Sequence, residues 1–339
     1  MNSRELLSRA MRLQTPVRVP LMASPSWGFV LVQNPVIDPV DLWHNHHNSY
    51  PEAFCNVTKR FHFDGVKIPG AGLLPLNHGN IAGICNESNE GTVITFTDGD
   101  SCTFLRDELP RYHFKVIPET DIDELDPDTI PEKIKYHPVS TRLRMYLQES
   151  PVGRINEIRA AQKIMGPEIS VHGQFYSPED YLIDLVGLEG AMMAFLTHPE
   201  KCKEILLRFA RAISFHVQEL IDAGVDAVCA SAPYAGQNFI SMETYERIIA
   251  PAQKIIVDAC ISGNVPCYCH TCGSIDDRLE SIIDVGFNGL ECLDPPPLGN
   301  VSLEEAVKRI GNRAFIKGNI DPVNVLLKGT AGQIRKEVR

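Results

Sequence analysis

A short run in the second half of the chain concentrates residue types that bind metals. Residues 266–273 read Pro-Cys-Tyr-Cys-His-Thr-Cys-Gly, with three cysteines and one histidine among six consecutive residues. In a β-strand alternate side chains point to the same side, so His270 and Cys272 project together. Cys267 and Cys269 then point to the other side. Because zinc prefers imidazole nitrogen and thiolate sulfur, the run predicts a pair of zinc ligands.

Two other interpretations of this run stay open. Cys269 and Cys272 also form a Cys-X-X-Cys pattern, which is typical of redox sites. That pattern normally opens a helix, whereas a strand directs the two thiols to opposite faces, so a redox pair is the less favoured interpretation. The run is also compatible with a buried, cysteine-rich strand whose histidine is only hydrogen-bonded, because two ligands do not make a metal site.

The next apolar run along the chain offers a third ligand. Residues 286–293 read Gly-Phe-Asn-Gly-Leu-Glu-Cys-Leu and predict another strand. Alternation places Glu291 on one face of that strand and Cys292 on the opposite face. We therefore predict that His270, Cys272 and Glu291 bind the metal and form the catalytic group.

Short apolar runs and amphipathic helical runs alternate over the second half of the chain. This alternation is typical of right-handed βαβ crossovers and a parallel sheet. The helical runs are 177–196, 199–223, 241–263 and 274–286. The strand candidates are 168–175, 225–231, 265–272, 286–293 and 313–319, and the first half adds 15–23 and 64–70.

Seven parallel strands with helices between them predict an α/β protein of the (β/α)8 TIM-type barrel class. A Rossmann sheet is disfavoured because no glycine-rich phosphate-binding motif follows an early strand. A polar insertion at about 84–135 contains Gly-Thr and Asp-Gly pairs that predict β-hairpins. An eighth strand is not found in the sequence as given, and we interpret residues 1–339 as a single barrel domain.

Barrel enzymes place their chemistry at the carboxyl ends of the strands, which here include His270 and Cys272. Aromatic and amide side chains at the other strand ends are therefore expected to build the wall of a small-molecule pocket. One alternative is that the polar members satisfy buried backbone groups, and Gly-Asn before Asp-Pro also suits a turn. The predicted substrate-binding residues are Trp27, His172, Gln174, Tyr234 and Asn319.

The composition excludes several classes of function. A net charge of −11 argues against nucleic acid as a partner, since a phosphate backbone requires a basic face. No apolar stretch is long enough to span a bilayer and no secretory signal is recognisable, so a cytoplasmic location and no membrane partner are expected. The ten cysteines are then free thiols rather than a disulfide framework. The sequence leaves a homodimer open.

The order and spacing of several motifs resemble the uroporphyrinogen decarboxylase superfamily. Residues 315–322, Phe-Ile-Lys-Gly-Asn-Ile-Asp-Pro, are similar to a Gly-Asn-Leu-Asp-Pro signature of that family. The opening residues 4–22 resemble its N-terminal helix and first strand. The other matching segments are 172–182, 223–236, 266–273 and 286–294. The resemblance implies a barrel and one of two chemistries.

The first chemistry is the decarboxylation of a tetrapyrrole without a metal. In the family, decarboxylases carry arginines after the first strand and an aspartate after the second. Residues 22–28 contain no arginine and residues 68–72 contain no acid, so this chemistry is the runner-up. A barrel that binds a small molecule without catalysis is a further alternative.

The second chemistry is corrinoid-dependent methyl transfer. The resemblance implies zinc held by His270 and Cys272, with Glu291 near the metal and a further cysteine near the C-terminus. That cysteine has no counterpart up to Arg339. The implied activity is a methyltransferase that moves a methyl group between a small methylated substrate or thiol and a corrinoid protein. The cobalamin would be carried by that partner, which docks at the barrel mouth.

Overall fold

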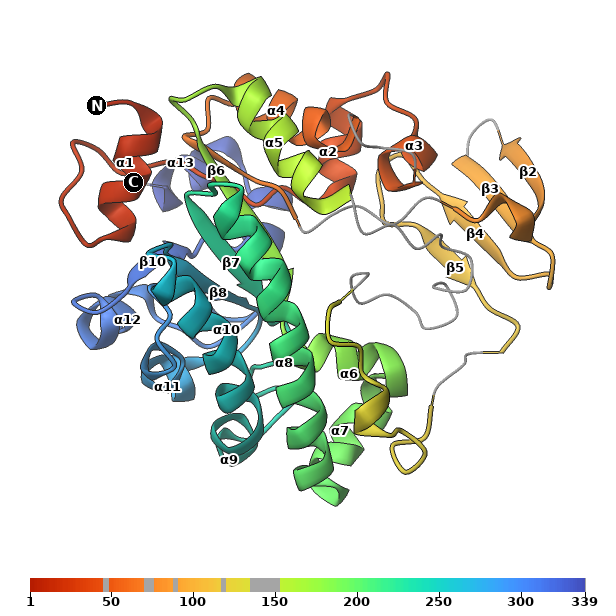
Figure 1. Ribbon diagram of the computed structural model, residues 1–339. Coiled ribbons are helices and arrows are strands. Elements are labelled where there is room, and N and C mark those ends of the chain that lie inside the picture. The colour runs from red at the N-terminus through yellow and green to blue at the C-terminus, as the bar shows by residue number, and fades with distance from the viewer. Residues whose placement is uncertain (45–48, 70–75, 88–90, 117–119, 135–152, 339) are drawn as a thin grey trace.

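The centre of the molecule is a curled sheet of six parallel strands surrounded by helices (Figure 1). The computed structural model describes residues 1–44, 49–69, 76–87, 91–116, 120–134 and 153–338. Within them the strands are hydrogen-bonded to one another in chain order. They are β1 (Gly65–Lys67), β6 (Ser170–Tyr176), β7 (Ala227–Ser231), β8 (Cys267–Thr271), β9 (Gly289–Cys292) and β10 (Phe315–Gly318).

Five of the six strands fall inside predicted ranges, β6 extends one residue past the range 168–175, and the α/β TIM-type barrel class is confirmed. The prediction of a strand at 15–23 is wrong, because the described residues form no strand there. The segment instead lies beside the start of β1, where the backbone nitrogen of Asp64 donates to the carbonyl of Leu21 over 2.7 Å. Pro16 and Pro20 lack the N–H groups that a sheet ladder needs, which explains the difference.

Helices cover the outer face of the sheet and close one end of the barrel. The predicted helix 177–196 is divided in two at Gly187, whose φ of +76° suits glycine. The predicted helix 241–263 consists of α9, a π-helical turn at Tyr245–Ile249, and α10. The α-helices from Gly153 onwards are α5 (Gly153–Met165), α6 (Pro178–Val186), α7 (Leu188–Thr197), α8 (Pro199–Asp222), α9 (Met242–Thr244), α10 (Ala250–Ser262), α11 (Leu279–Asp284), α12 (Leu303–Ile310) and α13 (Ala331–Glu337).

The first half adds further helices and a separate antiparallel sheet. The sheet projects to one side of the barrel (Figure 1), and its buried face is formed by Ile94, Phe96, Cys102 and Phe104. The predicted hairpins are therefore confirmed. The helices are α1 (Ser3–Met11), α2 (Trp27–Gln33), α3 (Pro39–His44) and α4 (Ser49–Arg60), and the strands are β2 (Ile81–Glu87), β3 (Gly91–Phe96), β4 (Ser101–Phe104) and β5 (Arg111–His113).

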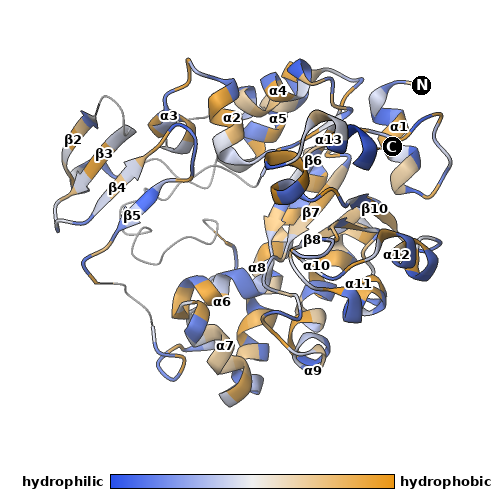
Figure 2. Cartoon of the chain, turned by 180° about the vertical axis from the view of Figure 1, so that it is seen from behind, coloured by the Kyte–Doolittle hydropathy of each residue, from blue (hydrophilic) through white to orange (hydrophobic). Residues whose placement is uncertain are grey.

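The inside of the barrel is filled by side chains, as in other packed barrels. Towards the amino ends of the strands, Leu7 and Met11 of α1 contact a cluster that includes Cys229 and Tyr268. Figure 2 shows apolar residues along the central strands, whereas α12 and α13 carry hydrophilic stretches. Among the described residues, no helix has the length and apolar character to cross a membrane.

Candidate metal centre

Neighbouring strands place a row of polar side chains across the barrel interior. The register pairs Ser231 with His270, His270 with Glu291, and Glu291 with Lys317. Tyr268, two residues before His270, belongs to the inner apolar cluster, so the row above it also faces inwards. The row lies near the carboxyl ends of β7 to β10, where barrel enzymes hold their active sites.

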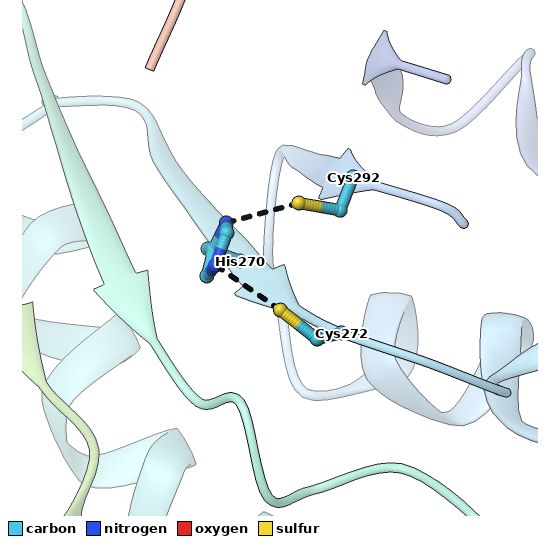
Figure 3. A group of neighbouring side chains, drawn as sticks. All are labelled: His270, Cys272 and Cys292. Atoms are coloured by element: carbon cyan, nitrogen blue, oxygen red, sulfur yellow. Dashed lines mark hydrogen bonds between the residues drawn. The ribbon is translucent and has the colours of Figure 1, made fainter. Parts of the chain in front are cut away.

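Three potential metal ligands, His270 of this row and two cysteines, lie close together (Figure 3). The Sγ atom of Cys272 lies 3.5 Å from Nε2 of His270, and Sγ of Cys292 lies 3.3 Å from Nδ1. One ligand atom from each residue lies within 4.8 Å of the others. A tetrahedral zinc ion, with bonds of about 2.3 Å to sulfur and about 2.0 Å to nitrogen, separates these ligands by about 3.5 Å. The two thiols and the imidazole therefore fit zinc in both chemistry and spacing.

The expectation that Cys292 points away from Glu291 and the histidine is wrong. Cys292 is the last residue of β9 and has a φ of +86°, and Leu293 has a φ of +53°. Alternation holds only inside a regular strand, so this turn directs the Cys292 thiol towards His270. Non-glycine residues with positive φ are uncommon and are found often at functional sites. The triple proline after Asp294 was the available sign that the strand ends here.

The two thiols have opposite tendencies to ionise. Contact with Cys292, together with His270, lowers the pKa of Cys272 to about 4. The same contact, together with burial, raises the pKa of Cys292 above its usual range. Burial opposes a charged imidazole, but the hydrogen bonds to Cys272 and Glu291 outweigh it and raise the pKa of His270. The centre thus combines a Cys272 side chain that ionises easily with a protonated Cys292 thiol as its hydrogen-bond partner.

Glu291 lies beside the histidine, as predicted, but both of its oxygens are already engaged. Oε1 accepts from Nδ1 of His270 at 2.9 Å, from Nζ of Lys67 at 2.8 Å and from Oγ of Ser24 at 3.0 Å. Oε2 pairs with the ammonium of Lys317. Burial alone would raise the pKa of Glu291, but the charges of Lys317 and Lys67 outweigh it and hold the pKa well below its usual range. Direct metal binding by Glu291 stays a prediction.

Two predicted pocket residues lie deeper in the barrel than the metal centre. His172 is in register with Ala227, four residues before Ser231, so it lies two inward-facing rows below His270. Its ring contacts the Tyr268 hydroxyl at 3.2 Å. Burial lowers the pKa of His172 to about 3, so the ring is neutral. Gln174, in register with Cys229, lies one row below the centre.

The remaining pocket predictions lie closer to the carboxyl ends of the strands. Trp27 opens α2, three residues after Ser24, and its ring lies 4.4 Å from that of Trp43. Burial and the nearby charges of Asp180 and Cys272 raise the pKa of Tyr234. Asn319 is half-buried just after β10. Whether these residues line one pocket with the metal centre stays a prediction.

Sequence reasoning missed four side chains of this site: Cys292, Lys67, Lys317 and Ser24. No sequence pattern indicated a role for the two lysines, because their role depends on contacts between segments far apart in the chain. Residues 70–72, part of the loop that lacks the acid expected of decarboxylases, lie outside the described residues.

The fold and the centre together define a TIM-type barrel protein with a histidine–cysteine cluster at the carboxyl ends of its strands. The sequence profile of the family described as uroporphyrinogen decarboxylase (URO-D) matches residues 99–339. Because this match covers more than two thirds of the chain, the protein belongs to that family.

Comparisons with known proteins lead to the methyltransferase branch of the family. The chain is 25% identical over 57% of its length to methylcobamide:CoM methyltransferase MtaA of Methanosarcina barkeri (strain Fusaro), covering 55% of that protein. It is 29% identical over 60% of its length to methylcobamide:CoM methyltransferase MtbA of Methanosarcina acetivorans, covering 59% of it. The chain thus spans little more than half the length of these curated relatives.

A solved structure agrees with the fold. A methyltransferase from Methanosarcina mazei superposes with a TM-score of 0.69 at 17% identity, over 99% of this chain and 88% of that one. At this identity the likeness concerns the fold alone. The resemblance inferred from the sequence, to the family and to its methyltransferase branch, is confirmed by the profile and the curated relatives.

Proposed function

We propose that the protein is a zinc-dependent methyltransferase, which moves a methyl group between a small methylated compound or a thiol and a corrinoid protein. The observation that carries the proposal is the cluster of His270, Cys272 and Cys292 at the carboxyl ends of β8 and β9. The similarity to methylcobamide:CoM methyltransferases supports it. A porphyrinogen decarboxylase, which the family resemblance describes as metal-free, would have no use for these ligands.

In this proposal His270, Cys272 and Cys292 hold the metal. The sequence predicts Glu291 as a direct ligand, but we propose that it acts from outside the ligand set, because its oxygens are occupied by Lys67, Lys317, Ser24 and the histidine. With Nδ1 directed to Glu291, the imidazole offers Nε2 to the metal, and this nitrogen is the one beside Cys272. A histidine that binds a metal commonly donates its other N–H to a carboxylate in this way.

The chemistry that the bound groups supply is Lewis-acid activation of a thiol or methyl donor by zinc, together with a methyl carrier in the corrinoid. The protein's own residues provide the setting. Glu291 fixes the imidazole, and the apolar cluster of Tyr268 and Cys229 below the row closes that side of the centre to water. We propose that Trp27 and Tyr234 supply apolar contacts for the substrate, and that His172, Gln174 and Asn319 orient it.

The proposed partner is a separate corrinoid protein that approaches the carboxyl ends of the strands. The metal centre lies at this end, while α1 and its apolar contacts fill the other. A methyl group carried on a partner would therefore approach the centre from the side of Cys272 and Cys292. The small-molecule substrate would occupy the space between the two proteins.

Metal analysis of protein purified without chelators tests the proposal. We expect about one zinc ion per chain in the wild type and a clear loss in Cys272→Ser, with the fold retained. Metal-free wild-type protein, together with turnover of uroporphyrinogen, would favour the decarboxylase. Metal-free protein that binds a small molecule without turnover would favour the binding barrel.

A further inference from the structure

The carboxylate of Glu291 is unusual because two lysines from opposite parts of the sheet converge on it. The carboxylate is buried, with 3% of the residue exposed, and Lys67 is 8% exposed. Lys317 is the neighbour of Glu291 on β10. Lys67 comes from β1, and three other strands separate β1 from β9 in the sheet. Its side chain therefore crosses the barrel interior to reach the acid.

One lysine would be enough to neutralise this acid. A buried charge is tolerated when it is paired and hydrogen-bonded, and the pair of Lys67 and Glu291 already meets that condition. Lys317 adds a second ammonium on the other oxygen, and Ser24 adds a hydroxyl. Donors on both oxygens fix the position and the plane of the carboxylate far more closely than neutralisation requires.

A fixed carboxylate has a direct consequence for the histidine. Glu291 Oε1 lies 2.9 Å from Nδ1 of His270, and an ionised carboxylate can only accept hydrogen bonds. The proton of a neutral imidazole must then be on Nδ1, which leaves the lone pair of Nε2 free on the side of Cys272. The orientation and tautomer of the ring thus depend on what holds Glu291.

We propose that Lys67 and Lys317 are positioning residues for the metal centre. By clamping Glu291 from two sides they keep His270 in the tautomer that carries its proton on Nδ1 and presents Nε2 to the metal. This inference rests on the proposed function for the identity of the metal, but its tests require no methyl transfer. The rival explanation is that the lysines only stabilise the barrel.

Metal affinity provides the first test. We expect Lys67→Met and Lys317→Met each to weaken zinc binding about tenfold in competition with a chromophoric chelator, the lower end of what loss of an outer-shell partner costs. Lys317→Arg should restore most of the affinity, since it keeps a cation beside Oε2. Lys254→Met, which removes an exposed lysine on α10 that pairs with Asp258, is the matched control and should bind zinc as the wild type does. Unchanged affinity in both Lys67→Met and Lys317→Met would overturn the proposal.

The tautomer of His270 provides a second test that a merely structural role would not affect. In metal-free protein labelled with ¹⁵N-histidine, at an alkaline pH at which the imidazole is neutral, long-range ¹H–¹⁵N correlation spectra distinguish Nδ1–H from Nε2–H rings, and His270→Gln identifies the signal. We expect the Nδ1–H form in the wild type and a mixture of forms in both methionine variants. A lower melting temperature with the wild-type tautomer would assign the lysines to stability alone.

Lys317, which is less deeply buried than Lys67, keeps the test usable if Lys67→Met does not fold. The Lys317 side chain is 18% exposed, so its replacement by methionine disturbs the packing of the barrel interior less than the replacement of Lys67 does. If zinc does not bind at all, the proposed function fails, whereas the tautomer measurement still decides the role of the lysines.

Discussion

The sulfur of Cys292 lies 3.3 Å from Nδ1 of His270, on the strand next to the one that carries the histidine. Cys272 flanks the other nitrogen of the same ring. The centre is therefore assembled from two adjacent strands. The positive φ of Cys292 turns the second thiol of the centre towards the histidine. A regular continuation of β9 would have directed this thiol away from the centre.

We predict that Cys292→Ser weakens zinc binding by more than about 100-fold, because loss of a direct ligand should exceed the 10–100-fold cost of losing an outer-shell partner. Chelator competition on metal-loaded protein measures the change. Cys85→Ser, at an exposed cysteine of the antiparallel sheet, is the control and should leave the affinity unchanged. Wild-type affinity in Cys292→Ser would exclude this residue from the ligand set.

We predict that Glu291→Gln lowers the free energy of unfolding by about 3 kcal/mol, since removing one partner of a buried ion pair leaves uncompensated charge. Here the charges left behind are those of Lys67 and Lys317. Urea denaturation measures the effect. The double variant Glu291→Gln with Lys67→Met should recover part of the loss, because it removes the more buried of the two lysines. A double variant less stable than the sum of its single variants would contradict this explanation.

Stability at acidic pH should depend on Asp64, which anchors the segment before β1. Burial opposes its charge, but hydrogen bonds from Arg18, Ser3 and the backbone of Leu21 outweigh it and lower the pKa of Asp64. An acid with a depressed pKa stabilises the fold above its unfolded pKa, about 3.9, and loses this contribution as the pH falls towards the folded pKa.

The corresponding experiment compares the wild type with Asp64→Asn by urea denaturation between pH 7 and pH 3. We expect the wild type to be more stable at pH 7 and the difference to shrink below about pH 4. High salt should reduce the difference, because the Arg18 side chain is largely exposed. A difference that grows on acidification would have the wrong sign for this mechanism.

The barrel strands could be predicted from the sequence because each combines an apolar run with a following helix. The hairpins could be predicted because Asp98–Gly99 is a strong turn signal, and Gly99 has the expected positive φ of +85°. The proximity of His270 and Cys272 could be predicted from strand alternation, because Cys272 directly follows the last residue of β8.

Other features depend on contacts or backbone angles that no local pattern encodes. The thiol of Cys292 enters the site because alternation fails at the last residue of β9. Lys67 enters it by crossing the barrel, a contact between residues 224 positions apart. The strand expected at 15–23 does not form, because Pro16 and Pro20 lack ladder donors, a signal that was visible in the sequence.

We predict that uroporphyrinogen is not a substrate. No arginine is present in residues 22–28 to bind its carboxylates, and two lysines near the centre are already paired with Glu291. Anaerobic incubation with uroporphyrinogen, followed by chromatography of the oxidised porphyrins, should show no loss of carboxyl groups. Accumulation of porphyrins with fewer carboxyl groups would support the alternative function of a decarboxylase.

The most direct measurement is the demethylation of free methylcobalamin by the zinc-loaded protein with a thiol acceptor, followed anaerobically by absorbance. Coenzyme M, the CoM in the names of the similar methyltransferases, is the first acceptor to test, followed by other small thiols and aryl methyl ethers in the reverse direction. We predict demethylation with at least one acceptor, its loss in Cys272→Ser and Cys292→Ser, and full activity in Lys254→Met. Equal rates in the wild type and both cysteine variants, at confirmed zinc loading of the wild type, would contradict the central claim.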